Sequence, residues 1–378
     1  IIGSGPAGYS CAVEAARLGK RALLIEASAE RIGGYWVNTG TVPSKAMREA
    51  AMIIGRFHGM FGDEKGRKPY ERFRMEDLLR YKDRILEART RKLKQDITDH
   101  RIDMLRGTGT LVNENMVEVV DPNGDHRRIT ADHILLATGS RPTSPRNFSV
   151  DHQNILNYES VLDLTHIPRR LVVVGSGVNA FEYATIFGLL GTRVSLLVDA
   201  PELLPFLDED VRSVLESILD RGNVQVRKGA RIRHIRNNPL RNCTEVGFSL
   251  AEEGGEPLRI LEVDHVLYGG GYVPNTDKLN LEAVNLRTDE DGYIPVNPFG
   301  QTSLESVYAA GDVVGSMNRA SVSFIQGRLA ATHMFAAAEK ESAGETHIPY
   351  GIYSIPEIAG IGLTQAEAER LGFDVVTG

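Results

Sequence analysis

The feature that most constrains the fold is a strand, a glycine-rich turn and a helix at the start of the chain. Residues 1–2 read as the end of a strand, residues 3–8 (GSGPAG) form the turn, and a helix continues to about Leu18. An apolar strand, residues 21–26, then ends in Glu26. Such glycines allow a tight turn, close approach of the backbone to a pyrophosphate, and packing of helix on strand. The pattern predicts a βαβ unit in which the helix N-terminus binds phosphates and the terminal acid binds a ribose.

The same pattern returns 172 residues later, at residues 175–180 (GSGVNA), between a buried-type strand and a helix to about Leu190. Ala180 replaces the third glycine, which the pattern tolerates, and the next strand, residues 194–199, ends in Asp199. An acid here favours a free 2′-hydroxyl and repels a 2′-phosphate, and no arginine follows until Arg212. The sequence therefore favours NAD over NADP, unless Asp199 only caps a loop.

Two dinucleotide sites on one chain imply electron transfer between a permanently held flavin and an exchanging nicotinamide. Between the two units we expect a helix after Pro43, a charged helix over residues 75–99 and strands over residues 102–136. Polar linkers are expected near residues 141–152 and 339–346. A new apolar pattern starts at about residue 347, and we expect the chain to be cut short at both ends.

The composition is that of a globular protein, with 42% hydrophobic and 25% charged residues. The net charge of −7, with both signs interspersed, gives no basic footprint for nucleic acid. No apolar stretch reaches the roughly 20 residues needed to span a bilayer. Cys11 and Cys243 form no metal or C-x-x-C motif and fit a reducing setting. We therefore predict a cytoplasmic protein without nucleic-acid, membrane or metal binding.

Three further segments resemble motifs of the pyridine nucleotide-disulfide oxidoreductase family. Residues 33–45 (GGYWVNTGTVPSK) resemble its redox-active segment, residues 137–142 (ATGSRP) its second flavin motif and residues 308–312 (YAAGD) its third. Their order and spacing match across nearly the whole chain. The resemblance implies an α/β fold with two Rossmann-like domains and a homodimer or larger assembly of the full-length protein. It also implies an FAD-binding domain of residues 1–145 plus 275–345, an NAD(P)-binding domain of residues 146–274 and the start of an α+β dimerisation domain over residues 346–378.

The redox-active segment departs from the family at both cysteine positions. The family carries C-x-x-x-x-C where this chain has Trp36 and Thr41, so no redox disulfide can form there. Reduction of lipoamide, glutathione or mercuric ion requires that dithiol and is therefore not expected of this chain. The Trp36 ring either covers the flavin face that a disulfide would occupy or fills space in the core.

Within the family, four segments resemble the branch of soluble pyridine nucleotide transhydrogenases, which has threonine at the second cysteine position: residues 38–41, 204–208, 274–277 and 351–358. This resemblance implies ping-pong hydride transfer through FAD, with the net reaction NADPH + NAD = NADP + NADH. One alternative is an NAD(P)H oxidase or diaphorase that passes electrons to oxygen, a quinone or a dye. Another is a non-catalytic flavin-binding relic.

The resemblance also assigns a catalytic pair, Lys45 beside the reactive nitrogen of the flavin and Glu182 from the second unit. A buried lysine needs a partner, and a cation near the ring stabilises the reduced flavin. Without the motif, Lys45 reads as a surface lysine of a helix entered through Pro43-Ser44.

The remaining site residues are assigned in the same way. Asp312 would hold the ribityl chain, Gly109 the adenine end, and Gly271 would pass close to the nicotinamide. The residues assigned to FAD are Gly3, Gly5, Pro6, Ala7, Gly8, Glu26, Gly33, Gly34, Thr41, Lys45, Gly109, Thr138, Gly139, Ser140, Gly311 and Asp312. Those assigned to NAD(H) and NADP(H) are Gly175, Gly177, Ala180, Glu182, Asp199 and Gly271. No metal ligand and no general base are assigned.

Overall fold

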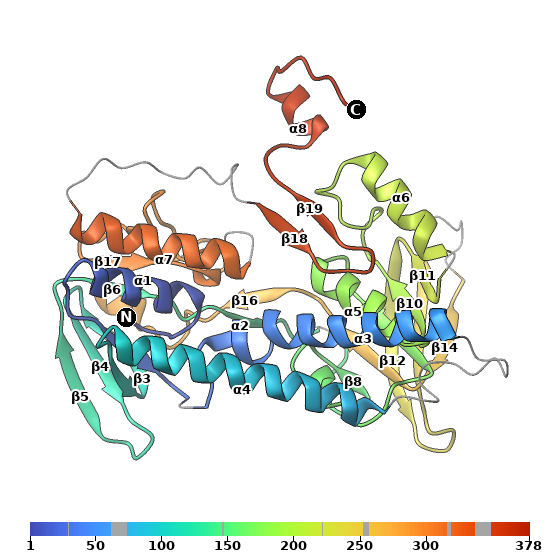
Figure 1. Ribbon diagram of the computed structural model, residues 1–378, viewed down its shortest axis with the longest axis horizontal. Coiled ribbons are helices and arrows are strands. Elements are labelled where there is room, and N and C mark those ends of the chain that lie inside the picture. Colours follow the sequence, from blue (N-terminus) through green and yellow to red (C-terminus); the bar gives the residue numbers. More distant parts are fainter. Residues whose placement is uncertain are drawn as a thin grey trace. The chain divides into compact units, whose positions relative to one another are not determined.

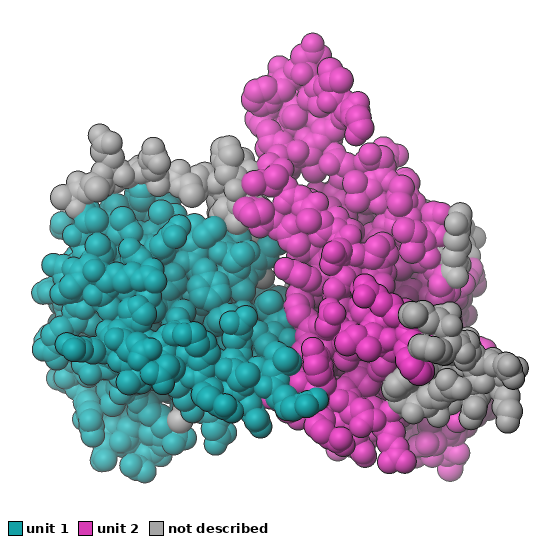
Figure 2. All heavy atoms as spheres, viewed as in Figure 1, with its two compact units in different colours: residues 1–43, 84–141, 272–348 teal, residues 44–83, 142–271, 349–378 magenta. Residues whose placement is uncertain are grey.

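The computed structural model describes residues 1–28, 30–61, 74–145, 147–220, 222–251, 257–315, 319–336 and 349–378. The chain divides into two compact units, shown in Figure 2. Unit 1 comprises residues 1–43, 84–141 and 272–348, and unit 2 comprises residues 44–83, 142–271 and 349–378. Each unit contains one of the two glycine-rich turns, so each can be described around its own turn.

Unit 1 is built on short parallel strands. Ile2 bridges both Ile25 and Leu136 in parallel, which joins the pairs β2–β1 and β6–β17 through the first residues of the chain. A three-stranded antiparallel meander, β3-β4-β5, belongs to the same unit (Figure 1). The strands are β1 (Leu23–Glu26), β2 (Asp103–Arg106), β3 (Thr108–Asn113), β4 (Met116–Val120), β5 (His126–Thr130), β6 (Ile134–Leu136) and β17 (Val307–Ala309).

Two helices of unit 1 pack closely because small residues line their contact. Helix α1 (Pro6–Arg17) has proline in its first turn, where the missing N–H costs nothing, and packs on α7 (Ala320–Phe335). A Cβ on Gly327 of α7 would lie 2.1 Å from the carbonyl oxygen of Ala7, so only glycine fits there. Unit 1 also contains α2 (Gly34–Asn38), η3 (Leu281–Val284) and η4 (Asp312–Val314).

Unit 2 contains a five-stranded parallel sheet in the order β11-β10-β9-β15-β8. The central strand β9 is fully buried at Leu171, Val172 and Val173, as expected for a parallel strand covered on both faces. Unit 2 also contains a three-stranded antiparallel sheet, β12-β13-β14. The elements are β8 (Ile155–Leu156), β9 (Arg170–Val174), α5 (Val178–Leu189), β10 (Arg193–Leu197), α6 (Glu209–Asp220), β11 (Val224–Arg227), β12 (Ala230–Asn238), β13 (Cys243–Leu250), β14 (Arg259–Val263) and β15 (His265–Tyr268).

The last described segment of unit 2 is the hairpin of β18 (Tyr350–Ile352) and β19 (Ile358–Gly360), followed by α8 (Gln365–Arg370). Helices α3 (Thr41–Phe61) and α4 (Met75–Asp99) contribute residues to both units. The other elements are η2 (Ser160–Asp163), β7 (Ser140–Pro142) and β16 (Tyr272–Pro274). Among the described helices, none is both long and apolar enough to cross a membrane.

Two local predictions are wrong. Helix α3 begins at Thr41 rather than after Pro43, so Pro43 and Ser44 lie in its first turn and do not form its cap. Strand β10 ends at Leu197, so Asp199 follows the strand instead of ending it. The second predicted linker, residues 339–346, lies outside the described residues.

Candidate functional site

Of the three motif glycines in the first turn, only Gly5 has open space beside it. Gly3 has φ +103°, and a Cβ there would lie 2.3 Å from the carbonyl oxygen of Ala137. A Cβ on Gly8 would lie 1.9 Å from the carbonyl oxygen of Gly3. A Cβ on Gly5, the N-cap of α1, would meet nothing within 4 Å. The space therefore lies beside first-turn N–H groups that have no partner within the helix, where a pyrophosphate can bind.

Glu26, at the end of β1, is held by hydrogen bonds from the glycine turn. Its carboxylate accepts from the backbone N–H of Ser4 at 3.1 Å, from the Ser4 hydroxyl at 2.5 Å and from the N–H of Ser28 at 3.1 Å. The Ser4 oxygen also accepts a hydrogen bond from the N–H of Gly33 at 3.1 Å. The sequence motif did not reveal Ser4, which fixes the carboxylate and ties the 33–34 segment to the turn.

The Gly-Gly pair that opens the redox-active segment also lies against the first turn. Gly33 and Gly34 have φ of +90° and +58°, and a Cβ on Gly34 would lie 3.1 Å from the Cα of Gly5. Thr41 begins helix α3. Gly109 lies over Ile2, because its Cβ would be 3.2 Å from that side chain. Gly33, Gly34 and Gly109 therefore lie against the turn or the strand that leads into it.

The Trp36 ring packs inside unit 1. It meets Phe324 edge to face, with ring centroids 4.8 Å apart, and the Arg89 guanidinium lies 6.0 Å from its centroid. It also packs against the buried cluster around Ala12 and Leu24. These contacts agree with the interpretation in which the ring fills space in the core, and its effect on the flavin face stays a prediction.

Asp312 brings a half-buried carboxylate to the start of α1. It begins η4, and the Ser140 hydroxyl donates a hydrogen bond to it at 2.8 Å. Burial raises the pKa of Asp312, against hydrogen bonds from Ser140 and Ser323. A Cβ on the preceding Gly311 would lie 3.2 Å from the Ala7 side chain. The Gly-Asp motif therefore packs on the same helix end that carries the first turn.

Thr138 and Gly139 are joined to the return of the chain into unit 1. The Thr138 hydroxyl donates to the carbonyl oxygen of Asn275 at 2.8 Å, and the N–H of Asn275 donates to Gly139 at 3.0 Å. A Cβ on Gly139 would meet nothing within 4 Å, so its backbone is open to a ligand.

The second glycine turn repeats this geometry in unit 2. Gly175 has φ +142°, and a Cβ there would lie 2.4 Å from the carbonyl oxygen of Gly269. Gly177, the N-cap of α5, has no atom within 4 Å of an added Cβ, and the same is true of Gly271. Ala180 is completely buried at the position of the third glycine. This turn also offers a helix N-terminus with open space beside its middle glycine.

Strand order places basic residues near Asp199 that sequence distance does not indicate. The N–H of Gly229 donates to Ala200 at 3.1 Å, and the N–H of Ala230 donates to Val198 at 2.8 Å. The end of β11 therefore lies beside residues 198–200 and brings Lys228 to this edge of the sheet. Lys228 pairs with Glu216 at 2.6 Å.

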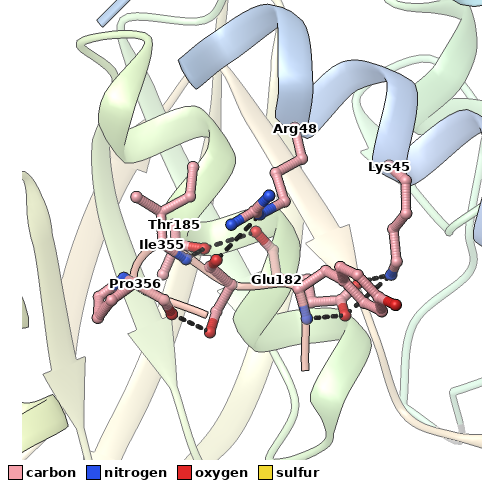
Figure 3. A network of polar contacts seen from close by, with 8 residues as sticks. Lys45, Arg48, Glu182, Thr185, Ile355 and Pro356 are labelled. Atoms are coloured by element: carbon pink, nitrogen blue, oxygen red, sulfur yellow. Dashed lines mark hydrogen bonds and ion pairs between the residues drawn. The ribbon is translucent and has the colours of Figure 1, made fainter. Parts of the chain in front are cut away.

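Lys45 and Glu182 form the predicted ion pair within unit 2 (Figure 3). The Lys45 ammonium donates to the two carboxylate oxygens of Glu182 at 3.0 and 2.8 Å. The Glu182 side chain is 3% exposed and that of Lys45 is 27% exposed. Burial lowers the pKa of Lys45, and the Glu182 charge opposes this shift. The pair is a buried carboxylate neutralised by a cation that retains one open side.

A family model described as pyridine nucleotide-disulphide oxidoreductase matches residues 1–327. The chain belongs to this family. As a member it is an FAD-dependent oxidoreductase with nicotinamide dinucleotides as substrates. The residues of unit 1 fit FAD, because open space beside Gly5 and a half-buried carboxylate at Asp312 adjoin one helix end.

Relatives and solved structures agree with this membership. The chain is 38% identical to the soluble pyridine nucleotide transhydrogenase of Marinomonas sp. (strain MWYL1), over 99% of this chain and 78% of that protein. It is 34% identical to the enzyme of the same name from Pseudomonas aeruginosa (strain LESB58), with the same coverage. LpdA from Mycobacterium tuberculosis is similar in structure, with a TM-score of 0.87 and 26% identity over 98% of this chain and 79% of that one. The flavoprotein disulfide reductase RclA from Escherichia coli, at 24% identity, shares the fold, with a TM-score of 0.84 over 99% of this chain and 79% of that one. The predicted α/β fold with two Rossmann-like domains is confirmed.

Proposed function

We propose that the protein transfers hydride between nicotinamide dinucleotides, with the net reaction NADPH + NAD = NADP + NADH. The two nucleotides take turns at the second glycine turn, in ping-pong order. The observation that carries this proposal is the repeated turn, with open space beside Gly5 in unit 1 and beside Gly177 in unit 2. FAD, when bound, supplies the chemistry of accepting a hydride from one nucleotide and returning it to the next.

The domain assignment belongs to the same proposal. Residues 1–145 plus 275–345 would bind FAD, residues 146–274 the nicotinamide dinucleotide, and residues 346–378 would begin a dimerisation domain. The glycine turns support the first two assignments, because each lies in a parallel α/β sheet of its own. The homodimer and the cytoplasmic location are likewise proposals.

The chemistry would proceed without a redox disulfide. Trp36 and Thr41 stand at the two positions that carry cysteine in the motif. Cys11 lies in α1, and burial raises the pKa of its thiol to about 12, so the thiol stays protonated and poorly nucleophilic. These residues support a reaction that does not involve dithiol substrates.

The basic residue near Asp199 supports the NADP half of the reaction. An acid at this position favours NAD, whereas a nearby cation accommodates a 2′-phosphate. Lys228, whose backbone lies at the neighbouring strand end beside residues 198–200, would supply such a cation on leaving its partner Glu216. The site would then combine the two features that a nucleotide exchanger needs.

Lys45 and Glu182 are the residues proposed to act on the reaction itself. A cation stabilises negative charge that develops on a reduced flavin, and Glu182 keeps that cation in place. Glu182 can do so because it accepts two hydrogen bonds from the ammonium group.

Anaerobic stopped-flow absorbance tests the proposal on the purified, FAD-loaded protein. NADPH is mixed first and thio-NAD second, while the visible flavin band is followed. We expect NADPH to bleach the band and thio-NAD to restore it. If only NADH bleaches the band, and oxygen rather than thio-NAD restores it, the protein is an NADH oxidase or diaphorase. A flavin that neither nucleotide bleaches would indicate a non-catalytic flavin binder.

A further inference from the structure

The segment of residues 353–356, between β18 and β19, crosses two helices of unit 2. The N–H of Tyr353 donates to Glu182 at 2.7 Å, and the N–H of Ile355 donates to the hydroxyl of Thr185 at 3.1 Å. Between them, the carbonyl of Ser354 accepts from the Arg48 side chain at 3.1 Å. Three consecutive residues of this segment thus contact α5, α3 and α5 in turn.

The spacing of the helix residues explains why one segment can reach all of them. Glu182 and Thr185 are three residues apart on α5, and Lys45 and Arg48 are three residues apart on α3, so each pair shares one face. Figure 3 shows Lys45 and Arg48 pointing from α3 toward this segment. The segment therefore contacts Glu182 of the ion pair and also Arg48 and Thr185, which lie one turn further along the two helices.

The side chain of Tyr353 adds a second contact to the lysine. The Lys45 ammonium nitrogen lies 4.3 Å from the centroid of the Tyr353 ring, within the range of a cation–π interaction. The same residue thus contacts both members of the pair, the carboxylate through its N–H and the ammonium through its ring.

We infer that Tyr353 is a positioning residue for the reaction. It keeps the ammonium group of Lys45 charged and holds it in one orientation. The inference rests on the role of Lys45 in the proposed function. A hydrogen-bonded carboxylate sets where the ammonium lies, and the ring face favours its protonated form. Burial, the first cause of the lowered pKa of Lys45, would otherwise discharge it at high pH.

Two other charged groups around Lys45 act on its charge in opposite directions. Glu182 on α5 favours the charged form, whereas Arg48, on the same helix as Lys45, disfavours it. Arg48 itself pairs with Glu357 beyond the segment at 2.9 Å. The Tyr353 ring is therefore the second favourable contact of the ammonium among the described residues.

Replacing Tyr353 with leucine or phenylalanine distinguishes the effect of the aromatic ring from that of apolar volume alone. Leucine keeps apolar cover over Lys45 but removes the ring face, whereas phenylalanine keeps the ring. We expect Tyr353→Leu to lower the pKa of Lys45 by about one pH unit, a tenfold change in proton affinity, and Tyr353→Phe to leave it nearly unchanged. Tyr350→Leu is the matched control, since Tyr350 lies on the same hairpin but packs its ring on Phe206.

Two measurements on the FAD-loaded protein give the answer. Competitive labelling of lysine amines with acetic anhydride, read by peptide mass spectrometry across pH 7 to 11, reports the pKa of Lys45 without turnover. The rate of flavin reduction by NADPH is measured over the same pH range. In Tyr353→Leu, the fall of this rate at alkaline pH should begin about one pH unit lower.

Unchanged labelling in Tyr353→Leu, or an equal change in Tyr353→Phe or Tyr350→Leu, would overturn the inference. If NADPH fails to reduce the flavin of the unmodified protein, the proposed function fails, while the labelling result still decides whether Tyr353 holds Lys45.

Discussion

The two glycine turns share their first and second glycines but differ at the third position. In unit 1, a Cβ at Gly8 would overlap the carbonyl oxygen of Gly3 at 1.9 Å, so no side chain fits. In unit 2, Ala180 occupies the same position and is fully buried. The helix and strand of unit 1 therefore pack more closely at the turn than those of unit 2.

The acids that follow the two turns also differ, because hydrogen bonds hold the side chain of the acid in unit 1 more firmly than that of the acid in unit 2. Glu26 accepts three hydrogen bonds, two of them from Ser4 in the turn. Within the described part of the chain, no hydrogen bond holds the Asp199 side chain, which follows its strand instead of ending it. A preorganised site suits a cofactor that stays bound, and a looser one suits nucleotides that exchange. The first turn therefore suits a cofactor that stays bound, and the second suits nucleotides that bind and leave.

Exchanging the third residues of the turns should give the largest difference. Gly8→Ala forces a Cβ into backbone, so we expect loss of bound FAD together with several kcal/mol of stability. Ala180→Gly removes one buried methyl from a helix and should cost only about 1 kcal/mol. The ratio of flavin to protein absorbance after gel filtration, with thermal unfolding by circular dichroism, measures both. Retention of FAD by Gly8→Ala would remove the proposed basis of the difference.

The two acids should respond differently to neutralisation. Glu26→Gln breaks charge-assisted hydrogen bonds from Ser4 and Ser28, so the FAD dissociation constant should rise about tenfold or more. Asp199→Asn should raise the KM for NADH by about tenfold while leaving the KM for NADPH unchanged or lower, because a repulsive charge is removed. Titration with FAD and steady-state kinetics with both nucleotides test this pair. An equal change of both KM values would show that Asp199 does not select the nucleotide.

The sequence was sufficient to predict both turns, the α/β fold and the Lys45–Glu182 pair, because each depends on a local motif or a resemblance across the whole chain. The contacts of Ser4 and Tyr353 could not be predicted, since they depend on which turn or segment reaches which helix. Lys228 was missed for a related reason. It lies near Asp199 only because β11 is the neighbour of β10 in the sheet, a pairing that sequence distance does not give.

The serines after the first glycines offer a matched pair for a smaller effect. Ser4 bonds Glu26 and Gly33, whereas the side chain of Ser176, at the equivalent position of unit 2, has no hydrogen-bond partner among the described residues. Ser4→Ala should weaken FAD binding by about three- to tenfold, the effect of one ordinary hydrogen bond. Ser176→Ala should leave the KM for both nucleotides unchanged. Isothermal titration with FAD measures the first, and a comparable loss in nucleotide affinity for Ser176→Ala would contradict the asymmetry.

The last difference concerns two carboxylates, the half-buried Asp312 in unit 1 and the buried Glu182 in unit 2. Glu182 is neutralised by Lys45, whereas the hydrogen bonds that reach Asp312 come from hydroxyl groups. Burial raises the pKa of Asp312, so the folded FAD-free protein binds this proton more tightly than the unfolded chain does. Its contribution to stability is present below the ordinary aspartate pKa and is lost as pH rises through the raised value. At neutral pH the ionised group therefore costs stability.

In FAD-free protein, Asp312→Asn should raise the melting temperature at pH 7.5 by about 2–4 °C and by less at pH 4.5. Glu182→Gln should lower it, because Lys45 loses its partner. Equal gains at both pH values, or a gain in both variants, would show that pairing does not distinguish the two carboxylates.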